Sequence, residues 1–366
     1  MNLCVVFLFI SNVSGFVPFS PFRIFDIPSE PILSKETFDD LQKPYDRSWY
    51  VVAQIDEITE DKPHKVTVWG KDYVIWKTKD NKYNALEDVC SHKGAALSIG
   101  TLKDNCIVCP YHGYEFNPKG ELVDVPGINF KASSTHKIRN FTVVERYDWL
   151  YLNIMETPAF ITPEKLDEMS NRIFIEPEAT DDTMTKVSLY QSFKTYPRLV
   201  SENSLDIMHI AFVHTFGNKV KPAPTYENPP KEISPDHWRT SYIYESGKDS
   251  MVSRMFNTHR IDIDNEFSLP HTTIARIKFG GKFVNTVVTA ACPINERETK
   301  LFVKTYRNFF ESKWCNGWFR YMMRETLNQD KVVIESIKTE NADGKFNMKF
   351  DKLQNVYRTL YKKYIH

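Results

Sequence analysis

The stretch "CSHKGAALSIGTLKDNCIVCPYHG", residues 90 to 113, contains three cysteines and two histidines in two short clusters. Cys90-x-His92 is the core of the first cluster and Cys109-x-x-His112 of the second, and sixteen residues separate the two pairs. Each pair lies on a Gly- or Pro-bearing loop beside a strand-like segment, so two loops can hold one cofactor between them. Zinc is one candidate, because two Cys and two His are a zinc ligand set.

The order of the four residues favours a different cofactor. "CSHKG" and "CPYHGYEF", followed by "GELVDVPG", resemble the Rieske domains of ring-hydroxylating and demethylating oxygenases over most of residues 45–155. The resemblance implies a [2Fe-2S] cluster in which Cys90 and Cys109 hold one iron and His92 and His112 hold the other. Neutral imidazoles in place of thiolates raise the potential of such a cluster, so it readily accepts and passes on single electrons.

Three residues of this stretch lie outside the ligand pattern. Lys93 stands where the family frequently has Arg, and Tyr114 stands where it frequently has Trp. Neither side chain is expected to touch a ligand. Cys106, between the two loops, is expected to be a buried small hydrophobe.

The composition of the chain favours small-molecule chemistry. At 366 residues the chain exceeds the usual size of one hydrophobic core, so two domains are expected. Lys plus Arg (47) equal Asp plus Glu (47), and no basic block has interleaved aromatics, so no nucleic-acid partner is expected. The six cysteines are too sparse for a disulfide scaffold, which favours reduced thiols or metal ligands. No window reaches the roughly 18 continuous apolar residues of a membrane-spanning helix.

Residues 1–44 have the character of a leader and N-terminal extension. "LCVVFLFI" is a short apolar core, and Val13, Ser14 and Gly15 resemble a signal-peptidase site, although no positive n-region precedes them. The alternative is an apolar N-terminal segment packed on the core. The following "FVPFSPFR" resembles the bipartite plastid leaders of algae with secondary plastids. We therefore expect a plastid location, where a reducing stroma protects thiols, with the cytoplasm as the alternative.

Two patterns divide the rest of the chain. Residues 45–155 alternate short β-branched and aromatic segments with turn residues, which predicts an all-β domain. Residues 156–366 mix helical spacing around 201–214, strands such as "TTIARIKF" and "FVNTVVTAAC", and two C-terminal helical stretches. The strands expected in the first domain are "WYVVAQI", "KVTVW", "YVIWK", "CIVCP" and "WLYLNI". The last helix is expected to bury one face, made of Leu353, Val356, Tyr357, Leu360 and Tyr364.

The segment "SENSLDIMHIAFVHTFG" contains residues that could bind a second metal. In a helix, Asp206 and His209 lie about 60° apart among apolar neighbours, where an acid and an imidazole need a partner or a metal. His214 lies about 140° from His209, so both can chelate one ion only if the helix distorts between them or ends near Phe212. On these residues alone, satisfied core histidines remain the alternative.

The same family has a second signature that bears on this choice. Its catalytic-domain pattern, N-x-x-D-x-x-H-x-x-x-x-H, occurs here without gaps. The resemblance implies that His209 and His214 bind a mononuclear ferrous iron. Asp206 would be the carboxylate that links His209 to a Rieske histidine, His112, of a neighbouring subunit, and Asn203 would lie beside the iron.

A facial triad of two His and one carboxylate leaves positions open for dioxygen and substrate. We seek its carboxylate in "RETLNQDKVVIESIKTEN". In a helix through this stretch Asp330 lies in the middle of an apolar face, where a carboxylate is expensive to bury unless a cation is present. The family's third ligand lies in a similar segment, so Asp330 is the predicted ligand. The apolar face consists of Phe319, Met323, Leu327, Val333, Ile334 and Ile337, whereas Glu325 and Glu335 point away from it and Glu340 lies at its margin.

The resemblance also implies an architecture and partners. The expected fold class is α+β: an all-β Rieske domain, then a helix-grip (START-like) catalytic domain whose curved antiparallel sheet and long helices enclose the iron. The family forms head-to-tail homotrimers, in which one subunit's cluster lies near the next subunit's iron. The chain has neither a G-x-G-x-x-G fingerprint nor a plant-type ferredoxin motif, so a separate ferredoxin or reductase must supply electrons. The motifs look closest to the vanillate O-demethylase and pheophorbide a oxygenase branch, although Cys315 stands alone where the pheophorbide group often has C-x-x-C.

Three functions remain, and they differ in metal content. The first is an oxygenase, a monooxygenase rather than a dioxygenase, that uses O2 and external electrons to hydroxylate or demethylate a small hydrophobic or aromatic ring compound. It predicts about three irons per chain. The second is a non-catalytic electron carrier or sensor with a hydrophobic-ligand-binding C-terminal domain, which predicts about two irons. The third is a zinc-bearing binding module, which predicts a colourless protein.

Overall fold

The computed structural model describes residues 44–129, 131, 133–158, 161–214, 217–247 and 251–365. Two compact units divide the chain, Met1–Asp40 and Leu41–His366, and all described residues belong to the second. Except for Pro44, the expected leader and extension (residues 1–44) lie outside the described residues. Within the described part of the chain, no helix has the length and apolar character needed to cross a membrane.

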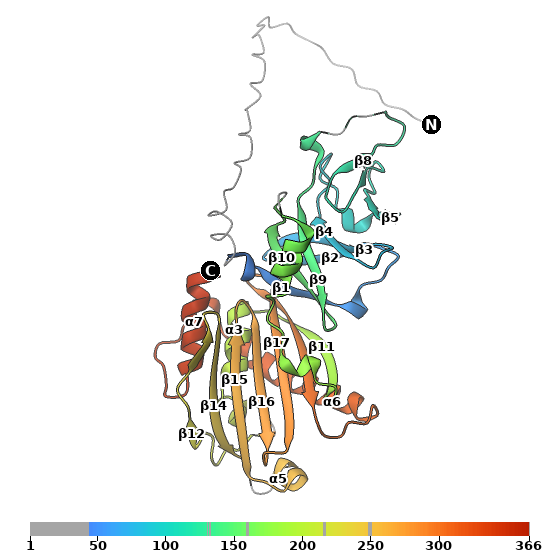
Figure 1. Ribbon diagram of the computed structural model, residues 1–366. Coiled ribbons are helices and arrows are strands. Elements are labelled where there is room, and N and C mark those ends of the chain that lie inside the picture. The colour runs from blue at the N-terminus through green and yellow to red at the C-terminus, as the bar shows by residue number, and fades with distance from the viewer. Residues whose placement is uncertain are drawn as a thin grey trace, which may run out of the picture. The chain divides into compact units, whose positions relative to one another are not determined.

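The first half of the described chain forms two antiparallel sheets (Figure 1). The larger has six strands in the order β1-β10-β9-β4-β3-β2, and it contains four of the five strands expected for this domain. Their β-branched and aromatic residues form the core; Val74, Ile75 and Trp76 are at most 1% exposed. The bounds are β1 Trp49–Gln54, β2 His64–Val68, β3 Lys71–Lys77, β4 Tyr83–Glu87, β9 Asn140–Arg146 and β10 Trp149–Glu156.

The smaller sheet carries the loops with the paired cysteines and histidines. Its strands run in the order β5-β6-β7-β8, and the expected strand "CIVCP" extends only from Cys106 to Val108. Cys106 is half-buried, not buried as expected, because it adjoins the exposed turn at Asp104 and Asn105. The bounds are β5 Thr101–Lys103, β6 Cys106–Val108, β7 Glu115–Phe116 and β8 Leu122–Asp124.

An antiparallel sheet of eight strands dominates the second half. The order is β11-β18-β17-β16-β15-β14-β12, and β13 pairs with β14. Both strands named from the sequence are present, as β16 and β17. The bounds are β11 Thr185–Phe193, β12 Tyr226–Glu227, β13 Lys231–Ser234, β14 His237–Glu245, β15 Arg260–Ser268, β16 Thr272–Phe279, β17 Phe283–Asn295 and β18 Glu298–Arg307.

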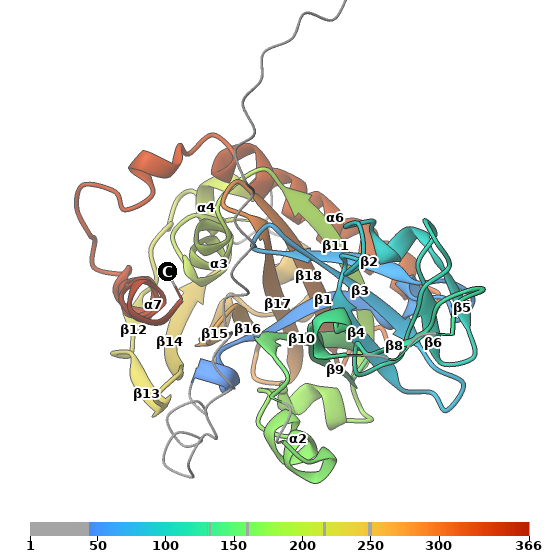
Figure 2. The ribbon, with the colours of Figure 1, turned by 90° about the horizontal axis from the view of Figure 1, so that it is seen from above.

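Helices pack on this sheet, with the long α6 along β11 (Figures 1 and 2). Val200 of α3 and Leu327 of α6 share one buried cluster with side chains of β11, β17 and β18. On α7, Leu353 and Tyr357 are buried as predicted, whereas Tyr364 is 37% exposed. An all-β domain followed by a sheet with long helices confirms the α+β class. The helices are α2 Pro163–Ser170, α3 Pro197–Leu205, α4 Ile210–Val213, α5 Met251–Phe256, α6 Cys315–Ile334 and α7 Lys352–Tyr364; short 3-10 turns are Ile55–Glu57, Leu97–Ile99, Ser134–His136, Pro177–Thr180 and Thr339–Asn341.

The predicted apolar face of α6 is correct except in its last turn. Leu327, Asp330 and Ile334 are buried. Val333, however, is 43% exposed, and Ile337, 36% exposed, lies beyond the end of the helix at Ile334. For Ile337 the reason is that a face extrapolated with helical spacing cannot hold past the residue at which the helix ends; Val333 lies within α6, at the margin of the buried face.

A buried histidine joins the six-stranded sheet to the eight-stranded sheet. The Val51 N–H of β1 donates to Nε2 of His271, at 2.9 Å. His271 is 3% exposed, and burial lowers its pKa to about 3. The ring is therefore neutral in the folded protein at physiological pH, and Nε2 is free of a proton and able to accept.

This histidine predicts acid sensitivity of the fold. Below pH 6.5 the unfolded chain binds a proton at His271 that the folded protein excludes down to about pH 3, so stability falls as pH falls through this window. The loss is about 1.4 kcal/mol per pH unit at most. We expect His271→Gln, whose amide oxygen can still accept from Val51, to be less acid-sensitive than the wild type. Thermal unfolding of both proteins between pH 7 and pH 5 measures this, and parallel curves would contradict it.

Candidate metal centres

The two loops at the smaller sheet have the same backbone conformation. In each, the cysteine N–H donates to the carbonyl five residues later, and a glycine N–H four residues after the cysteine donates back to the cysteine carbonyl. Both glycines have φ of +73°. The bonds are Cys90 N to Ala95 O (2.8 Å), Gly94 N to Cys90 O (2.9 Å), Cys109 N to Tyr114 O (2.8 Å) and Gly113 N to Cys109 O (3.0 Å). Two matching loops of this kind can hold one cofactor between them.

The four side chains differ in exposure. Cys90 and Cys109 are buried at 3% and 1%, and their thiols are within hydrogen-bonding reach of each other. His92 and His112 are exposed, with ring centroids 4.6 Å apart. Desolvation and the neighbouring His112 lower the pKa of His92, which favours the neutral ring that metal ligation requires. The four residues thus fit a cluster with a buried thiolate end and an imidazole end that reaches the surface.

Tyr114 contacts one of these histidines, contrary to expectation. Its ring stacks on His92, with centroids 4.8 Å apart and planes within 6°. Tyr111 stacks on His112 in the same way, at 4.0 Å and 30°. The sequence showed Tyr111 and Tyr114 on either side of His112 but not which imidazole each would face. The two tyrosines therefore hold the imidazole planes.

The two glycines form a matched pair for testing the loops. An alanine Cβ at Gly113 would lie 2.9 Å from Cγ of Pro126, whereas one at Gly94 would meet nothing within 4 Å. Both substitutions place a side chain in the left-handed region, at about 1–2 kcal/mol. We expect Gly113→Ala to lower the temperature at which visible cluster absorbance is lost by several degrees more than Gly94→Ala does. Equal losses would contradict the closer packing of the second loop.

The second metal-binding segment is not one helix. α3 ends at Leu205, and Asp206 is extended, with φ −79° and ψ 119°. The Asp206 carboxylate accepts from Met208 N at 2.7 Å, a local bond by which Asp favours leaving a helix. The expected 60° relation between Asp206 and His209 is therefore wrong. Of the two conditions for chelation by both histidines, a distortion between them or a helix end near Phe212, the second is confirmed, since α4 covers only Ile210–Val213 and His214 is extended.

The break brings three predicted residues together. Nε2 of His209 lies 3.1 Å from Nε2 of His214, and these atoms lie 3.4 and 3.5 Å from Oδ1 of Asp330. Within the described residues this is the one group of three or more His, Cys, Asp and Glu residues whose donor atoms all lie within 4.8 Å of one another. Ligands about 2.1 Å from one ion and at right angles would be roughly 3 Å apart, so the three atoms fit a single metal ion.

The surroundings of Asp330 also indicate a missing cation. The residue is 7% exposed, and its Oδ1 is buried without a well-formed hydrogen bond. Burial opposes the charged form of His209, but the Asp330 carboxylate outweighs this and raises the pKa of His209. For His214, burial dominates and lowers the pKa. The rival carboxylates lie elsewhere: Glu325 and Glu335 are half-buried and Glu340 is exposed.

Gln329 completes the site and was not identified from the sequence. Its Oε1 lies 3.1 Å from Nδ1 of His214, and because an amide oxygen can only accept, Nδ1 must carry the proton. The lone pair of His214 is then on Nε2, which faces His209 and Asp330. In the sequence, Gln329 is marked only by its position directly before Asp330, and a search of this segment for a carboxylate ligand passes over an amide.

Asp206 and Asn203 lie beside the triad but outside it. Both line the cavity that contains His209, His214 and Asp330. Nδ1 of His209 is buried and makes no well-aligned hydrogen bond within the described residues, although the Asp206 backbone is close enough to help raise the pKa of the ring. Asp206 precedes His209 by three residues, and one of its carboxylate oxygens accepts a hydrogen bond from Met208 N.

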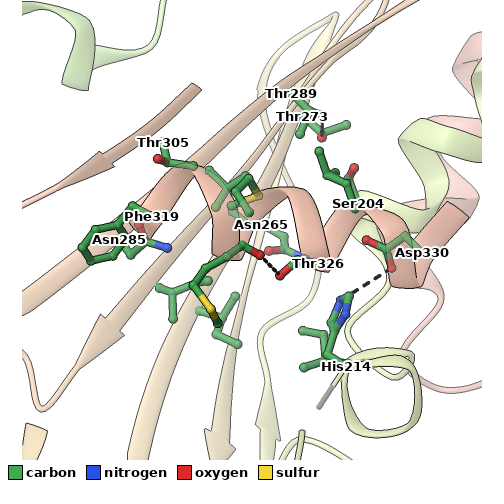
Figure 3. Close-up of a pocket in the computed structure, with 18 of the residues that line it drawn as sticks. Ser204, His214, Asn265, Thr273, Asn285, Thr289, Thr305, Phe319, Thr326 and Asp330 are labelled. Atoms are coloured by element: carbon green, nitrogen blue, oxygen red, sulfur yellow. Dashed lines mark hydrogen bonds and ion pairs between the residues drawn. The ribbon is translucent and has the colours of Figure 1, made fainter. Parts of the chain in front are cut away.

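The triad lies at one end of a cavity of about 290 Å³, where Figure 3 shows His214 and Asp330. The cavity follows α6, whose residues 319, 322, 323, 326, 327 and 330 line it at helical spacing, over roughly 16 Å. β15 to β18 form the opposite wall. Most of the lining is apolar or aromatic, including Ile263, Ile277, Phe279, Val287, Phe309 and Phe319. An apolar slot ending at a metal site suits an organic ring compound.

Comparison with known proteins assigns both halves of the chain. Residues 48–140 match the Rieske [2Fe-2S] domain family, and residues 193–366 match the vanillate O-demethylase oxygenase C-terminal domain. The structure of dicamba monooxygenase bound to 3,6-dichlorosalicylic acid has a TM-score of 0.74 at 20% identity, covering 87% of this chain and 97% of that one. The Pseudomonas putida NdmA structure with caffeine has a TM-score of 0.71 at 22% identity, covering 88% and 92%. At these identities both structures support the fold alone.

Curated relatives include the dicamba O-demethylase oxygenase component of Stenotrophomonas maltophilia, 31% identical over 46% of this chain and 47% of its own length. The vanillate O-demethylase oxygenase subunit of a Pseudomonas strain is 30% identical over 46% of this chain and 44% of its own length. The chain spans about half the length of the curated relatives it matches. The chain is a homologue of the Rieske non-haem iron oxygenases, with a Rieske [2Fe-2S] domain followed by a vanillate O-demethylase oxygenase C-terminal domain.

Proposed function

We propose that this chain is the oxygenase component of a Rieske monooxygenase system, acting on an organic ring compound. The reaction inserts one atom of O2 into a C–H bond and reduces the other to water with two electrons and two protons. When the new hydroxyl is on a methoxy carbon, the product breaks down to the free hydroxyl compound and formaldehyde. The observation that carries the proposal is the triad of His209, His214 and Asp330 at one end of an apolar cavity.

The proposal assigns a set of ligands to each centre. Cys90, His92, Cys109 and His112 would hold the cluster, which supplies electrons one at a time. His209, His214 and Asp330 would hold a ferrous ion, which supplies open positions for dioxygen. Gln329 keeps the His214 proton on Nδ1, so that Nε2 is available without a tautomer change. The apolar walls exclude water and place the ring of the substrate beside the triad.

We further propose a partner arrangement. His92 and His112 are exposed, so an electron donor such as a ferredoxin or a flavin-dependent reductase can approach the imidazole end of the cluster. A head-to-tail trimer would bring that same end to the triad of the next subunit. Asp206, three residues before His209 and beside it in the cavity, would then connect His209 with His112 of the partner subunit. Mass measurement of the intact assembly tests the trimer.

Isotope labelling tests the proposed reaction. Reduced protein loaded with ferrous ion is mixed with 18O2 and a panel of neutral ring compounds, and products are analysed by mass spectrometry. When the oxygen enters a ring C–H bond, the proposal expects one 18O atom per product molecule. When it enters a methoxy C–H bond, the 18O leaves as formaldehyde, which is trapped at once, and the ring product keeps its own oxygen. Either product should form only with both centres reduced, at about one per two electrons. The non-catalytic carrier would consume no O2 in a substrate-dependent way. Label from water in every product would contradict oxygenation.

A further inference from the structure

One polar group in the cavity wall has no use in the chemistry proposed above. Asn265 on β15 is 3% exposed, and its Nδ2 donates to the Leu205 carbonyl at 3.3 Å. Because a carbonyl can only accept, this bond fixes the orientation of the amide: the NH2 group faces Leu205, and the oxygen Oδ1 points the other way. Oδ1 is buried and has no hydrogen-bond partner among the described residues. A buried acceptor without a donor is unfavourable by about 1–3 kcal/mol unless a ligand supplies one.

Asn265 belongs to a row of side chains that runs across the sheet and forms part of the cavity wall. Across the sheet, Asn265 pairs with Ala275, Ala275 with Val287, and Val287 with Thr305, so these four residues form one row. All four line the cavity. The small Ala275 next to Asn265 leaves room for a ring edge to approach the amide oxygen. A flat molecule lying on this row would reach Oδ1 with its edge.

The helix opposite adds a second acceptor. Thr326 lies one turn before Asp330 on α6, and its hydroxyl donates to the Met322 carbonyl at 3.0 Å (Figure 3). Because its proton is used within the helix, Thr326 offers only lone pairs to the cavity. Among the described lining residues, the acids are Asp206 and Asp330, and none is Lys or Arg. Acceptor oxygens and acids favour a hydrogen-bond donor and disfavour an anion.

We propose that the cavity takes an uncharged compound of two or more fused rings that carries a hydroxyl or N–H donor, and that Asn265 accepts from this donor. The inference deepens the proposed function and rests on it. The cavity follows roughly 16 Å of α6, which is more than a single ring beside the triad would fill. We therefore expect a ligand of at least two fused rings. Asn265 would thereby fix which ring edge faces the triad.

Three probes of one shape separate charge from hydrogen bonding. 2-Naphthol has a donor, 2-methylnaphthalene has a methyl group in its place, and 2-naphthoate carries a negative charge. Binding is measured by equilibrium dialysis at pH 7 on the full chain, purified anaerobically. We expect 2-naphthoate to bind at least about tenfold more weakly than 2-naphthol, since none of the described lining residues is Lys or Arg. This comparison is made with no ferrous ion at the triad, because the ion could itself ligate the carboxylate. Equal or tighter binding of 2-naphthoate, or no binding of either neutral probe, would overturn the proposal.

Two variants then assign the donor contact. Asn265→Leu should weaken the binding of 2-naphthol by about five- to tenfold and leave the affinity for 2-methylnaphthalene within about twofold of the wild type. A general disturbance of the cavity would weaken both neutral probes alike and would overturn the role of Asn265. Asn285→Leu is the comparison variant, because Asn285 lines the same cavity from β17, two strands away from Asn265; it should leave the ratio of the two affinities within about twofold of the wild type. If it removed the 2-naphthol preference instead, Asn265 would be the wrong residue.

The same protein preparations also test the proposed oxygenase function, on which the inference rests. Iron per chain and the visible spectrum are recorded for every variant, so a variant that fails to fold is recognised and Asn265→Ala takes its place. About two irons per chain in the wild type, unchanged by added ferrous ion, would refute the proposed oxygenase whatever the probes do. About three irons with no discrimination by Asn265 would refute the substrate class and leave the oxygenase standing.

Discussion

Replacing Asp330 with alanine is expected to remove the mononuclear iron and leave the cluster intact. The variant loses the one negative ligand of the triad, so His209 and His214 alone would hold the ion weakly. Iron per chain should fall from about three to about two while the reducible visible chromophore stays. Product formation should fall by at least about a thousandfold, because a bound metal ion contributes several kcal/mol to the reaction. Iron analysis and single-turnover product yield measure both effects.

The same helix supplies a control for this variant. Glu325 lies on α6 and is half-buried away from the triad, so Glu325→Ala should keep about three irons and turnover within about twofold of the wild type. The triad assignment is wrong if Asp330→Ala keeps both its iron and its turnover. It is also wrong if Glu325→Ala, rather than Asp330→Ala, loses iron.

The second large effect concerns Asp206. Asp206→Asn keeps an oxygen that can accept from Met208 N, so the break between α3 and α4 should persist and both metal centres should load fully. The neutral amide is a weaker acceptor for a histidine N–H than the carboxylate, so electron transfer between cluster and iron should slow by about 10- to 100-fold. Stopped-flow reoxidation of the dithionite-reduced cluster by O2 with substrate present measures this rate.

The iron content decides how that result is read. A slow variant with about three irons supports a coupling role, whereas a slow variant with about two irons would mean that Asp206 only supports the iron site. Unchanged reoxidation in a fully loaded Asp206→Asn protein would contradict the role of Asp206. Asn203→Ala, which alters a neighbouring cavity residue, should leave the reoxidation rate within about threefold.

Much of the site could be predicted because it is encoded locally. The spacings of Cys90-x-His92 and Cys109-x-x-His112 place each pair on one turn, and the structure gives both turns the same backbone. Asp330 was predicted from its place in an apolar stripe, and its burial and the position of its Oδ1 beside two histidines agree with that reasoning. The strands of the first domain were predicted from alternating β-branched and aromatic residues, which are buried in the sheet.

The remaining features depend on contacts between distant segments. The helix through residues 201–214 breaks at Asp206 because its side chain bonds to Met208 N, and helical spacing alone did not show that. Gln329 is recognisable only once α6 packs beside His214, and the stacking of Tyr114 on His92 depends on how two loops meet. Asn265 stands out only when its oxygen is seen to lack a donor. A one-dimensional pattern does not carry these relations.

The central claim is that one chain holds two iron centres, and metal analysis tests it most directly. Iron and acid-labile sulfide are measured on anaerobically purified protein, with visible spectra before and after dithionite. The account predicts about three irons to two sulfides and a brown chromophore that dithionite reduces. About two irons to two sulfides, unchanged after incubation with ferrous ion, would contradict it, because His209, His214 and Asp330 would then bind no iron.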